Sequence, residues 1–236
     1  MRCFLIALLF VALLLTGCGQ QQAVSTEPAQ TVAAETGALP AAPADTHPET
    51  TYPDPQDMVF VAVADYIPDI RIDLKYAGTD NFTGQVIYEF STVYLRYGTV
   101  QKLAAVQEDL KQLGLALKIW DGYRPVAAQH RLWEVCPDSR YVANPNTGFS
   151  SHSRGNTVDL TLVDSEGREV VMPTGFDDFS AKADRDYADC SQEAADNALL
   201  LEALMEKHGF TGYKAEWWHF TDTEDYPVEE LFQPTS

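Results

Sequence analysis

Two short segments in the carboxyl-terminal half of the chain, SSHSRGNTVDLTL and EWWHF, place the strongest constraint on its fold. The first segment contains His152 and Asp159, and the second contains Glu216 and His219. Two imidazoles and one carboxylate form a sufficient protein ligand set for a catalytic zinc, which keeps a fourth position open for water or substrate. If His152, Asp159 and His219 bind one metal, the chain must fold so that these distant segments meet, with Glu216 close to the bound water.

The spacing within each segment adds a geometric requirement. Gly155 lies between His152 and Asp159, and a glycine lets a tight turn lead directly into the strand that would carry Asp159. Glu216 and His219 are separated by an odd number of positions, so a regular strand would point them to opposite faces. A bulge or a strand end is therefore needed to bring both side chains into one site.

Hydrophobic periodicity and turn residues predict the elements of the domain. The expected helices span residues 100–113, 126–135 and 193–208, and the expected strands span residues 58–63, 70–74, 115–120, 157–163, 170–172 and 212–220. Gly167 predicts a hairpin between the strands at 157–163 and 170–172, and residues 121–125 predict a turn that places Arg124 at a strand end. Because strands and helices do not alternate strictly, we expect a single α+β domain with a mainly antiparallel sheet flanked by helices.

The composition narrows the possible partners. Acidic residues outnumber basic ones 35 to 16, which gives a formal net charge of −19. This balance argues against nucleic acid as a partner, because its phosphates require basic side chains. A hydrophobic content of 45% is sufficient for a packed core that does not depend on disulfides.

The amino-terminal 18 residues have the features of an export signal. Arg2 precedes an apolar run at residues 4–15 that is too short to span a bilayer comfortably. The sequence Leu-Thr-Gly-Cys that ends at Cys18 resembles a bacterial lipobox, which implies cleavage before Cys18 and acylation of that cysteine. We therefore expect an extracytoplasmic protein anchored by lipid to a bacterial membrane, facing the periplasm or the cell surface. An ordinary signal peptide with a chance cysteine is the alternative.

Residues 19–51 predict a flexible stalk between this anchor and a folded domain at residues 52–236. The segment contains only one leucine, and it lacks aromatic residues, lysine and arginine. Such a segment cannot bury enough apolar surface to fold.

Two cysteines remain in the expected mature domain. Cys136 and Cys190 form an even pair, which in an oxidising compartment is consistent with a disulfide. Two free thiols are the alternative, because the sequence does not give the distance between them.

Four motifs together, SSHSRGNTVDLTL, EWWHF, WDGYRP and DLKYAGTDNFTG, resemble those of the D-Ala-D-Ala dipeptidases among the zinc D,D-peptidases, which include the vancomycin-resistance dipeptidases. The similarity extends from about Asp65 to Phe232. It implies an α+β fold with one zinc ion held by His152, Asp159 and His219. It also implies that Glu216 acts as general base and then as acid, and that Arg124 stabilises the transition state.

The same resemblance suggests residues that contact the substrate. Ser150 and Ser151 would bind the substrate carboxylate or only shape the turn before His152. Asp177 and Asp178 would line the pocket, although acidic pairs in loops are commonly just solvated. Tyr76 would position the substrate.

The expected activity is hydrolysis of D-alanyl-D-alanine to two D-alanines during cell-wall peptide turnover, with peptidoglycan fragments as further partners. The vancomycin-resistance enzymes act in the cytoplasm, so an exported enzyme fits recovery of D-alanine from wall fragments better than resistance. One alternative is a D,D-carboxypeptidase that trims the terminal D-Ala of peptidoglycan stem peptides. Another is a non-catalytic lipoprotein that binds the cell wall, for which loss of a ligand or of the acid would be expected.

Overall fold

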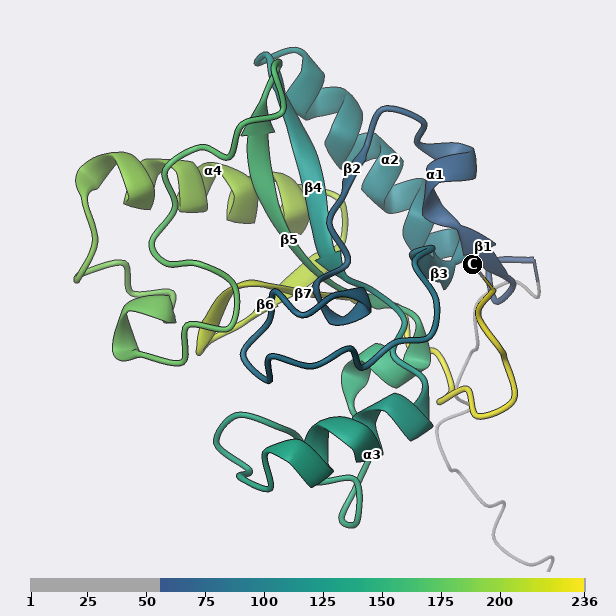
Figure 1. Ribbon diagram of the computed structural model, residues 1–236. Coiled ribbons are helices and arrows are strands. Elements are labelled where there is room, and N and C mark those ends of the chain that lie inside the picture. The colour runs from purple at the N-terminus through teal and green to yellow at the C-terminus, as the bar shows by residue number, and fades with distance from the viewer. Residues whose placement is uncertain (1–55, 236) are drawn as a thin grey trace, which may run out of the picture. The chain divides into compact units, whose positions relative to one another are not determined.

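The computed structural model describes residues 56–235 (Figure 1). The predicted signal at residues 1–18, the acylated Cys18 and the stalk at residues 19–51 lie outside the described residues, and they stay predictions. Among residues 56–235, no helix is both long and apolar enough to cross a membrane.

A five-stranded sheet forms the centre of the domain. Its strands, in spatial order, are β2 (Arg71–Ile72), β4 (Leu115–Asp121), β5 (Thr157–Asp164), β7 (Glu216–Asp222) and β6 (Phe210–Tyr213). Only the β2–β4 pair is parallel, and the other three pairs are antiparallel. A second, two-stranded antiparallel sheet joins β1 (Phe60–Ala62) to β3 (Tyr94–Arg96). The predicted α+β fold with a mainly antiparallel sheet is confirmed.

Two long helices cover one face of the larger sheet. The helices are α1 (Val63–Tyr66), α2 (Tyr97–Lys111), α3 (Val126–Val135) and α4 (Gln192–Lys207), and the short 3-10 helices are η1 (Lys75–Ala77), η2 (Ser151–Arg154) and η3 (Ala181–Ala183). Helix α2 packs on β4, α4 packs on β5, β6 and β7, and the two helices contact each other. In Figure 1, α3 lies apart from both of them.

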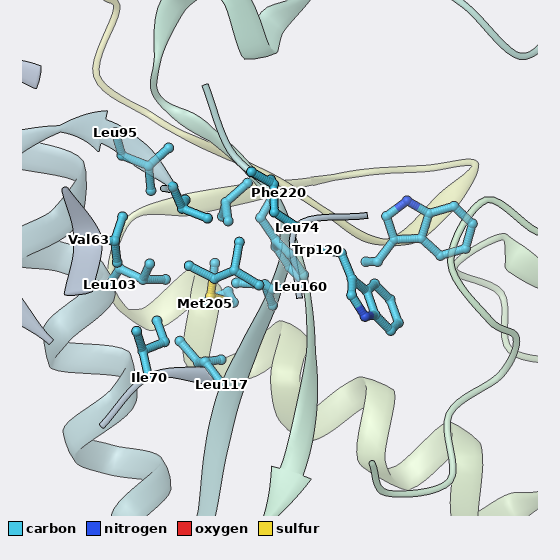
Figure 2. Packing of buried hydrophobic residues seen from close by; sticks show 14 of the residues in the cluster. Val63, Ile70, Leu74, Leu95, Leu103, Leu117, Trp120, Leu160, Met205 and Phe220 are labelled. Carbon is cyan, nitrogen blue, oxygen red and sulfur yellow. The ribbon is translucent and has the colours of Figure 1, made fainter. Parts of the chain in front are cut away.

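The core lies between this helix pair and the sheet. Leu103 of α2 and Met205 of α4 are fully buried beside Leu117 and Leu160 of the sheet (Figure 2). Every residue of β5 except the last is buried, because this strand is central and covered on both faces. Since successive side chains of a strand point to opposite faces, Leu160 on the helix side places Asp159 on the other side.

Two predicted strands are wrong in detail. Residues 212–220 are not one strand, because the chain reverses at Lys214 and Ala215 to form the β6–β7 hairpin. The predicted strand at residues 170–172 is reduced to a single bridge between Val163 and Glu169. The segment leaves the sheet there, since the carbonyl of Val171 accepts a hydrogen bond from the Asn197 side chain of α4 rather than continuing the ladder.

Of the two alternatives for the cysteines, the structure agrees with free thiols. Cys136 and Cys190 are both unbonded, so the suggested disulfide is not formed. Cys136 follows the last residue of α3 and Cys190 precedes α4, and these two helices lie apart in Figure 1. Disulfide geometry requires the two Cα atoms to approach within about 7 Å.

The turn at Gly155 joins η2 to β5. Its φ of 77° lies in the left-handed region that favours glycine. A Cβ atom at this position would also overlap the ring of Phe60. Both constraints apply at the point where the chain passes from His152 to Asp159.

Replacing this glycine with alanine should lower the free energy of unfolding by about 1–3 kcal/mol, because the left-handed backbone becomes strained and the ring of Phe60 must move. Urea denaturation of Gly155→Ala measures the loss. Gly114→Ala is the matched control, since Gly114 has a φ of 73° with open space around it. Equal losses in the two variants would show that the close approach to Phe60 contributes nothing.

Candidate metal centre

Three elements bring the predicted ligands together. His152 comes from η2, Asp159 from β5 and His219 from β7. Asp159 and His219 are direct partners in the antiparallel β5–β7 ladder, and directly opposed side chains lie on the same face of a sheet. One ligand atom from each of the three residues lies within 4.8 Å of the others, so the cluster can hold one metal ion.

The Asp159 carboxylate lies between the two imidazoles. Its Oδ2 is 3.3 Å from Nε2 of His152, and its Oδ1 is 3.0 Å from Nδ1 of His219. Within residues 56–235, Oδ1 is buried and has no hydrogen-bond partner. Because a buried carboxylate oxygen needs a partner, this geometry fits a cation bound among the three side chains.

The two imidazoles are oriented for metal binding. Nδ1 of His152 lies 2.9 Å from the carbonyl oxygen of Gly122, which can only accept, so Nδ1 carries the proton and the Nε2 lone pair faces Asp159. Nε2 of His219 lies 3.5 Å from Oγ1 of Thr221, which leaves Nδ1 to face the cluster. Outer hydrogen bonds of this kind fix the tautomer and the ring plane of metal-binding histidines.

Charge inside the cluster sets its protonation. Burial opposes ionisation of Asp159, but the adjacent imidazoles of His152 and His219 hold the pKa of its carboxyl well below the usual range. Burial disfavours the charged form of His152, yet the neighbouring Asp159 carboxylate raises the pKa of this imidazole. Asp159 is therefore ionised at neutral pH, as a metal ligand must be.

Glu216 adds a second carboxylate beside the cluster. It is the first residue of β7, and its Oε2 is 3.6 Å from Nδ1 of His219. The β6–β7 register is interrupted between the pairs Gly212–Phe220 and Tyr213–Glu216, so the irregularity that the residue spacing required is present. Burial raises the pKa of Glu216, which suits a group that exchanges protons near neutral pH.

Arg124 is buried in the wall of the same cavity. Its Nη2 donates to Oδ2 of Asp121 at 2.6 Å, and its Nη1 donates to Oε1 of Gln129 at 2.9 Å. The guanidinium carbon lies 5.2 Å from the ring centroid of Tyr76. Its backbone N–H donates to the carbonyl of His152 at 3.2 Å, so the turn that carries Arg124 is joined directly to η2.

The sequence analysis missed Asp121. This fully buried carboxylate accepts hydrogen bonds from Arg124, from the Tyr88 hydroxyl at 2.7 Å and from the Gly122 N–H at 2.8 Å. Its Oδ2 also lies 3.7 Å from Nδ1 of His152. The available signal was an acidic residue directly after an apolar strand and three positions before a candidate catalytic arginine.

A cavity of about 280 Å³ surrounds the cluster. Ser150 and Ser151 line it, the first buried and the second half-buried. Asp177 also lines it and accepts a hydrogen bond of 2.8 Å from the Tyr76 hydroxyl. Asp178 lines a neighbouring pocket instead, where it caps the backbone N–H of Ser180. Of the two adjacent acids, only Asp177 belongs to this cavity.

The environment of Asp177 is unusual for a carboxyl group. Burial raises its pKa to about 8, although the hydrogen bond from Tyr76 acts in the opposite direction. Its φ of 55° is in the left-handed region, which a residue other than glycine adopts only where the surrounding structure holds it. Four aromatic residues that the sequence analysis did not single out also line the cavity, namely Tyr141, Phe149, Phe179 and Tyr213.

Comparisons with known proteins identify the same family across the described domain. Residues 56–234 match the family described as D-Ala-D-Ala dipeptidase. The D-alanyl-D-alanine dipeptidase of Escherichia coli K12 is 41% identical over 177 residues, covering 74% of this chain and 90% of that protein. The D-alanyl-D-alanine dipeptidase of Streptomyces coelicolor is 35% identical over 193 residues, covering 73% and 96%. That of Enterococcus faecium is 32% identical over 189 residues, covering 71% and 94%.

Removing the partner of Arg124 should destabilise the fold strongly. We expect Asp121→Ala to lower the free energy of unfolding by about 3–5 kcal/mol, because it leaves a buried guanidinium without its carboxylate. Denaturant unfolding of the metal-free protein measures this loss. The milder Asp121→Asn, which keeps an acceptor oxygen, provides a second measurement if the alanine variant does not fold.

Asp73→Ala is the control for this prediction. Asp73 pairs with Lys75 and Lys118, both at 3.0 Å, but it is 38% exposed. Exposed pairs contribute about 1 kcal/mol or less. A loss at Asp121 no larger than the loss at Asp73 would contradict the assignment of Asp121 as the essential partner of Arg124.

Proposed function

Because the chain belongs to the D-Ala-D-Ala dipeptidase family and is a metallopeptidase, we propose that it hydrolyses D-alanyl-D-alanine to two D-alanines with one zinc ion. The observation that carries this proposal is the cluster of His152, Asp159 and His219, whose ligand atoms lie within 4.8 Å of one another. Glu216 and Arg124 line the same cavity.

The donor set fits zinc. Two imidazole nitrogens and one carboxylate oxygen are the three protein ligands of several catalytic zinc sites, in which the remaining position stays open. When bound, zinc supplies Lewis acidity to the scissile carbonyl and lowers the pKa of a bound water to about 7. The buried Asp159 oxygen without a hydrogen-bond partner supports a cation at this position.

Glu216 moves the proton. Its carboxylate accepts a proton from the attacking water and delivers it to the nitrogen of the departing D-alanine. Burial, which raises the pKa of Glu216, brings the carboxyl closer to the pH at which both transfers are efficient. Oε2 of Glu216 lies 3.6 Å from Nδ1 of His219, so this carboxylate is next to the three ligands without being one of them.

Arg124 stabilises the negative charge that develops on the carbonyl oxygen during attack. A guanidinium is charged at every working pH, and Asp121, Gln129 and Tyr76 fix its orientation before substrate arrives. Preorganised charge of this kind requires little rearrangement during the reaction, which is why it lowers the barrier effectively.

The cavity also has groups for both ends of a free dipeptide. Asp177 accepts the substrate ammonium, and the positive charge would lower the raised pKa of this buried carboxyl. Ser150 and Ser151, which directly precede His152 and line the same cavity, donate hydrogen bonds to the substrate carboxylate. A small cavity that recognises two termini favours a dipeptide over a longer peptide.

The amino-terminal sequence supports a proposal for the location and the physiological role. Export, acylation of Cys18 and a stalk at residues 19–51 would hold the domain outside the cytoplasm, where peptidoglycan fragments are released. We propose that the enzyme acts there in cell-wall peptide turnover and recovers D-alanine.

The direct test is a parallel assay of the free dipeptide and a stem pentapeptide that ends in D-Ala-D-Ala. The zinc-loaded protein should release D-alanine from the dipeptide, and removing the metal with a chelator should abolish this activity until zinc is restored. Turnover of the pentapeptide without turnover of the dipeptide would overturn the proposed substrate in favour of a D,D-carboxypeptidase.

The Glu216→Ala variant separates loss of proton transfer from loss of metal binding. The variant keeps all three ligands, so it should bind one zinc ion while the turnover number falls about 10²–10⁴-fold. Unchanged turnover in this variant would remove Glu216 from the mechanism. Failure of both substrates with the zinc-loaded wild-type protein would support the non-catalytic alternative.

Acylation is tested in cells. Mass spectrometry of the mature protein should find a lipid on Cys18 as the first residue, and Cys18→Ala should move the protein from the membrane fraction to the soluble fraction. A mature chain that is cleaved elsewhere and remains soluble would contradict the lipid anchor.

A further inference from the structure

Arg185 does not line the metal-binding cavity, yet it contacts the hairpin that carries Glu216 and His219. It lies in the loop between β5 and α4, and its backbone N–H donates to the Lys214 carbonyl at 3.1 Å. Its Nε donates to the Tyr213 carbonyl at 3.0 Å. Its Nη2 donates to the carbonyls of residues 217 and 219, at 2.9 and 3.0 Å. One residue therefore binds four carbonyl groups of the β6–β7 hairpin.

These contacts coincide with the break in the β6–β7 ladder. Gly212 pairs with Phe220, but the next residue, Tyr213, pairs with Glu216, so residues 217–219 bulge out of the regular register. Carbonyl groups at a bulge need donors other than the neighbouring strand, and the guanidinium supplies them. The same bulge lets Glu216 and His219 meet at one cavity despite a spacing that would separate them in a regular strand.

Arg185 is itself held in place from three directions. Its side chain is only 9% exposed, and Nη1 lies 3.2 Å from Oε2 of Glu202 on α4. The Tyr187 hydroxyl donates to the same oxygen at 2.7 Å. The guanidinium carbon lies 4.3 Å from the ring centroid of Phe220. Gly212 also lies against the guanidinium, since a Cβ atom at this position would overlap it.

We propose that Arg185 is a positioning residue, which holds the bulged part of β7 so that Glu216 and His219 face the same metal ion. The inference rests on the proposed zinc site. The planar fork of a guanidinium directs several N–H groups at fixed angles, whereas a lysine ammonium cannot reach the separated carbonyls with one geometry. The carbonyl groups that Arg185 binds extend from residue 213 to residue 219, which is the whole irregular segment.

The first test measures zinc affinity of Arg185→Ala and Arg185→Lys by competition with a chromophoric chelator. We expect the dissociation constant to rise about 10–100-fold in Arg185→Ala, the usual effect of losing an outer partner of a metal ligand. Arg185→Lys should lie closer to the alanine variant than to the wild type. With saturating zinc, kcat should fall while KM for the dipeptide changes little, because Arg124, Asp177 and the serines are untouched.

Gly212→Ala tests the same contact without changing the arginine. The added methyl group displaces the guanidinium, so zinc affinity should fall in the same direction as in Arg185→Ala. The visible absorption spectrum of the cobalt-substituted protein should also shift in both variants, since it reports ligand geometry at the metal. A purely structural role for Arg185 would not move this spectrum.

Lys102→Met is the matched control. Lys102 pairs with Asp222 at 2.5 Å near the other end of β7, so its loss weakens the anchoring of the same strand away from the bulge. This variant should lower the thermal midpoint without changing zinc affinity or the cobalt spectrum. If Arg185→Ala and Gly212→Ala behave in the same way as this control, the positioning role is refuted. A wild-type protein that binds no zinc would instead refute the proposed function.

Discussion

The register between β5 and β7 is the interaction on which the site depends. It sets Asp159 directly opposite His219, and it turns the next residue of each strand, Leu160 and Phe220, into the hydrophobic core. A slip of one position would turn Asp159 toward the helices and Leu160 into the cavity. Because Leu160 and Phe220 are fully buried in the core (Figure 2), the free energy of apolar burial fixes the register. The hydrophobic core thereby determines where the two ligands lie.

The carboxylate of Asp121 connects the third proposed ligand, His152, to Arg124. Asp121 accepts from the Gly122 N–H, and the carbonyl of Gly122 in turn accepts from Nδ1 of His152. The other oxygen of Asp121 holds Arg124. The orientation of His152, a proposed metal ligand, and the orientation of Arg124, which is proposed to stabilise the transition state, are therefore coupled through one turn, WDGYRP. A change in that turn would disturb both functions together.

Much of this arrangement could be predicted from local patterns, and the remainder depends on long-range contacts. The periodicity of residues 100–113 predicted α2, and the two short motifs identified the residues that the structure gathers at the cavity. The β6–β7 hairpin was missed because its turn, Lys214 and Ala215, contains neither glycine nor proline. Arg185 and Asp121 gave little local signal, since each acts on carbonyl, amide or guanidinium groups that only folding brings near. Which of the two acids, Asp177 or Asp178, enters the cavity was also undecidable from spacing alone.

Three of the groups at the cavity lie where the ladder of the sheet begins or breaks. Glu216 opens β7, His152 belongs to a single 3-10 turn, and Arg124 follows the end of β4. At such places the backbone loses the partners that a neighbouring strand provides, so an irregular edge would ordinarily be mobile. Here charged side chains provide the missing hydrogen bonds. Arg185 donates to carbonyl groups of β7, and Asp121 accepts from the N–H of Gly122 in the turn after β4. Catalysis needs side chains held in place by supporting contacts, and these buried charged groups supply hydrogen bonds where the regular ladder is missing.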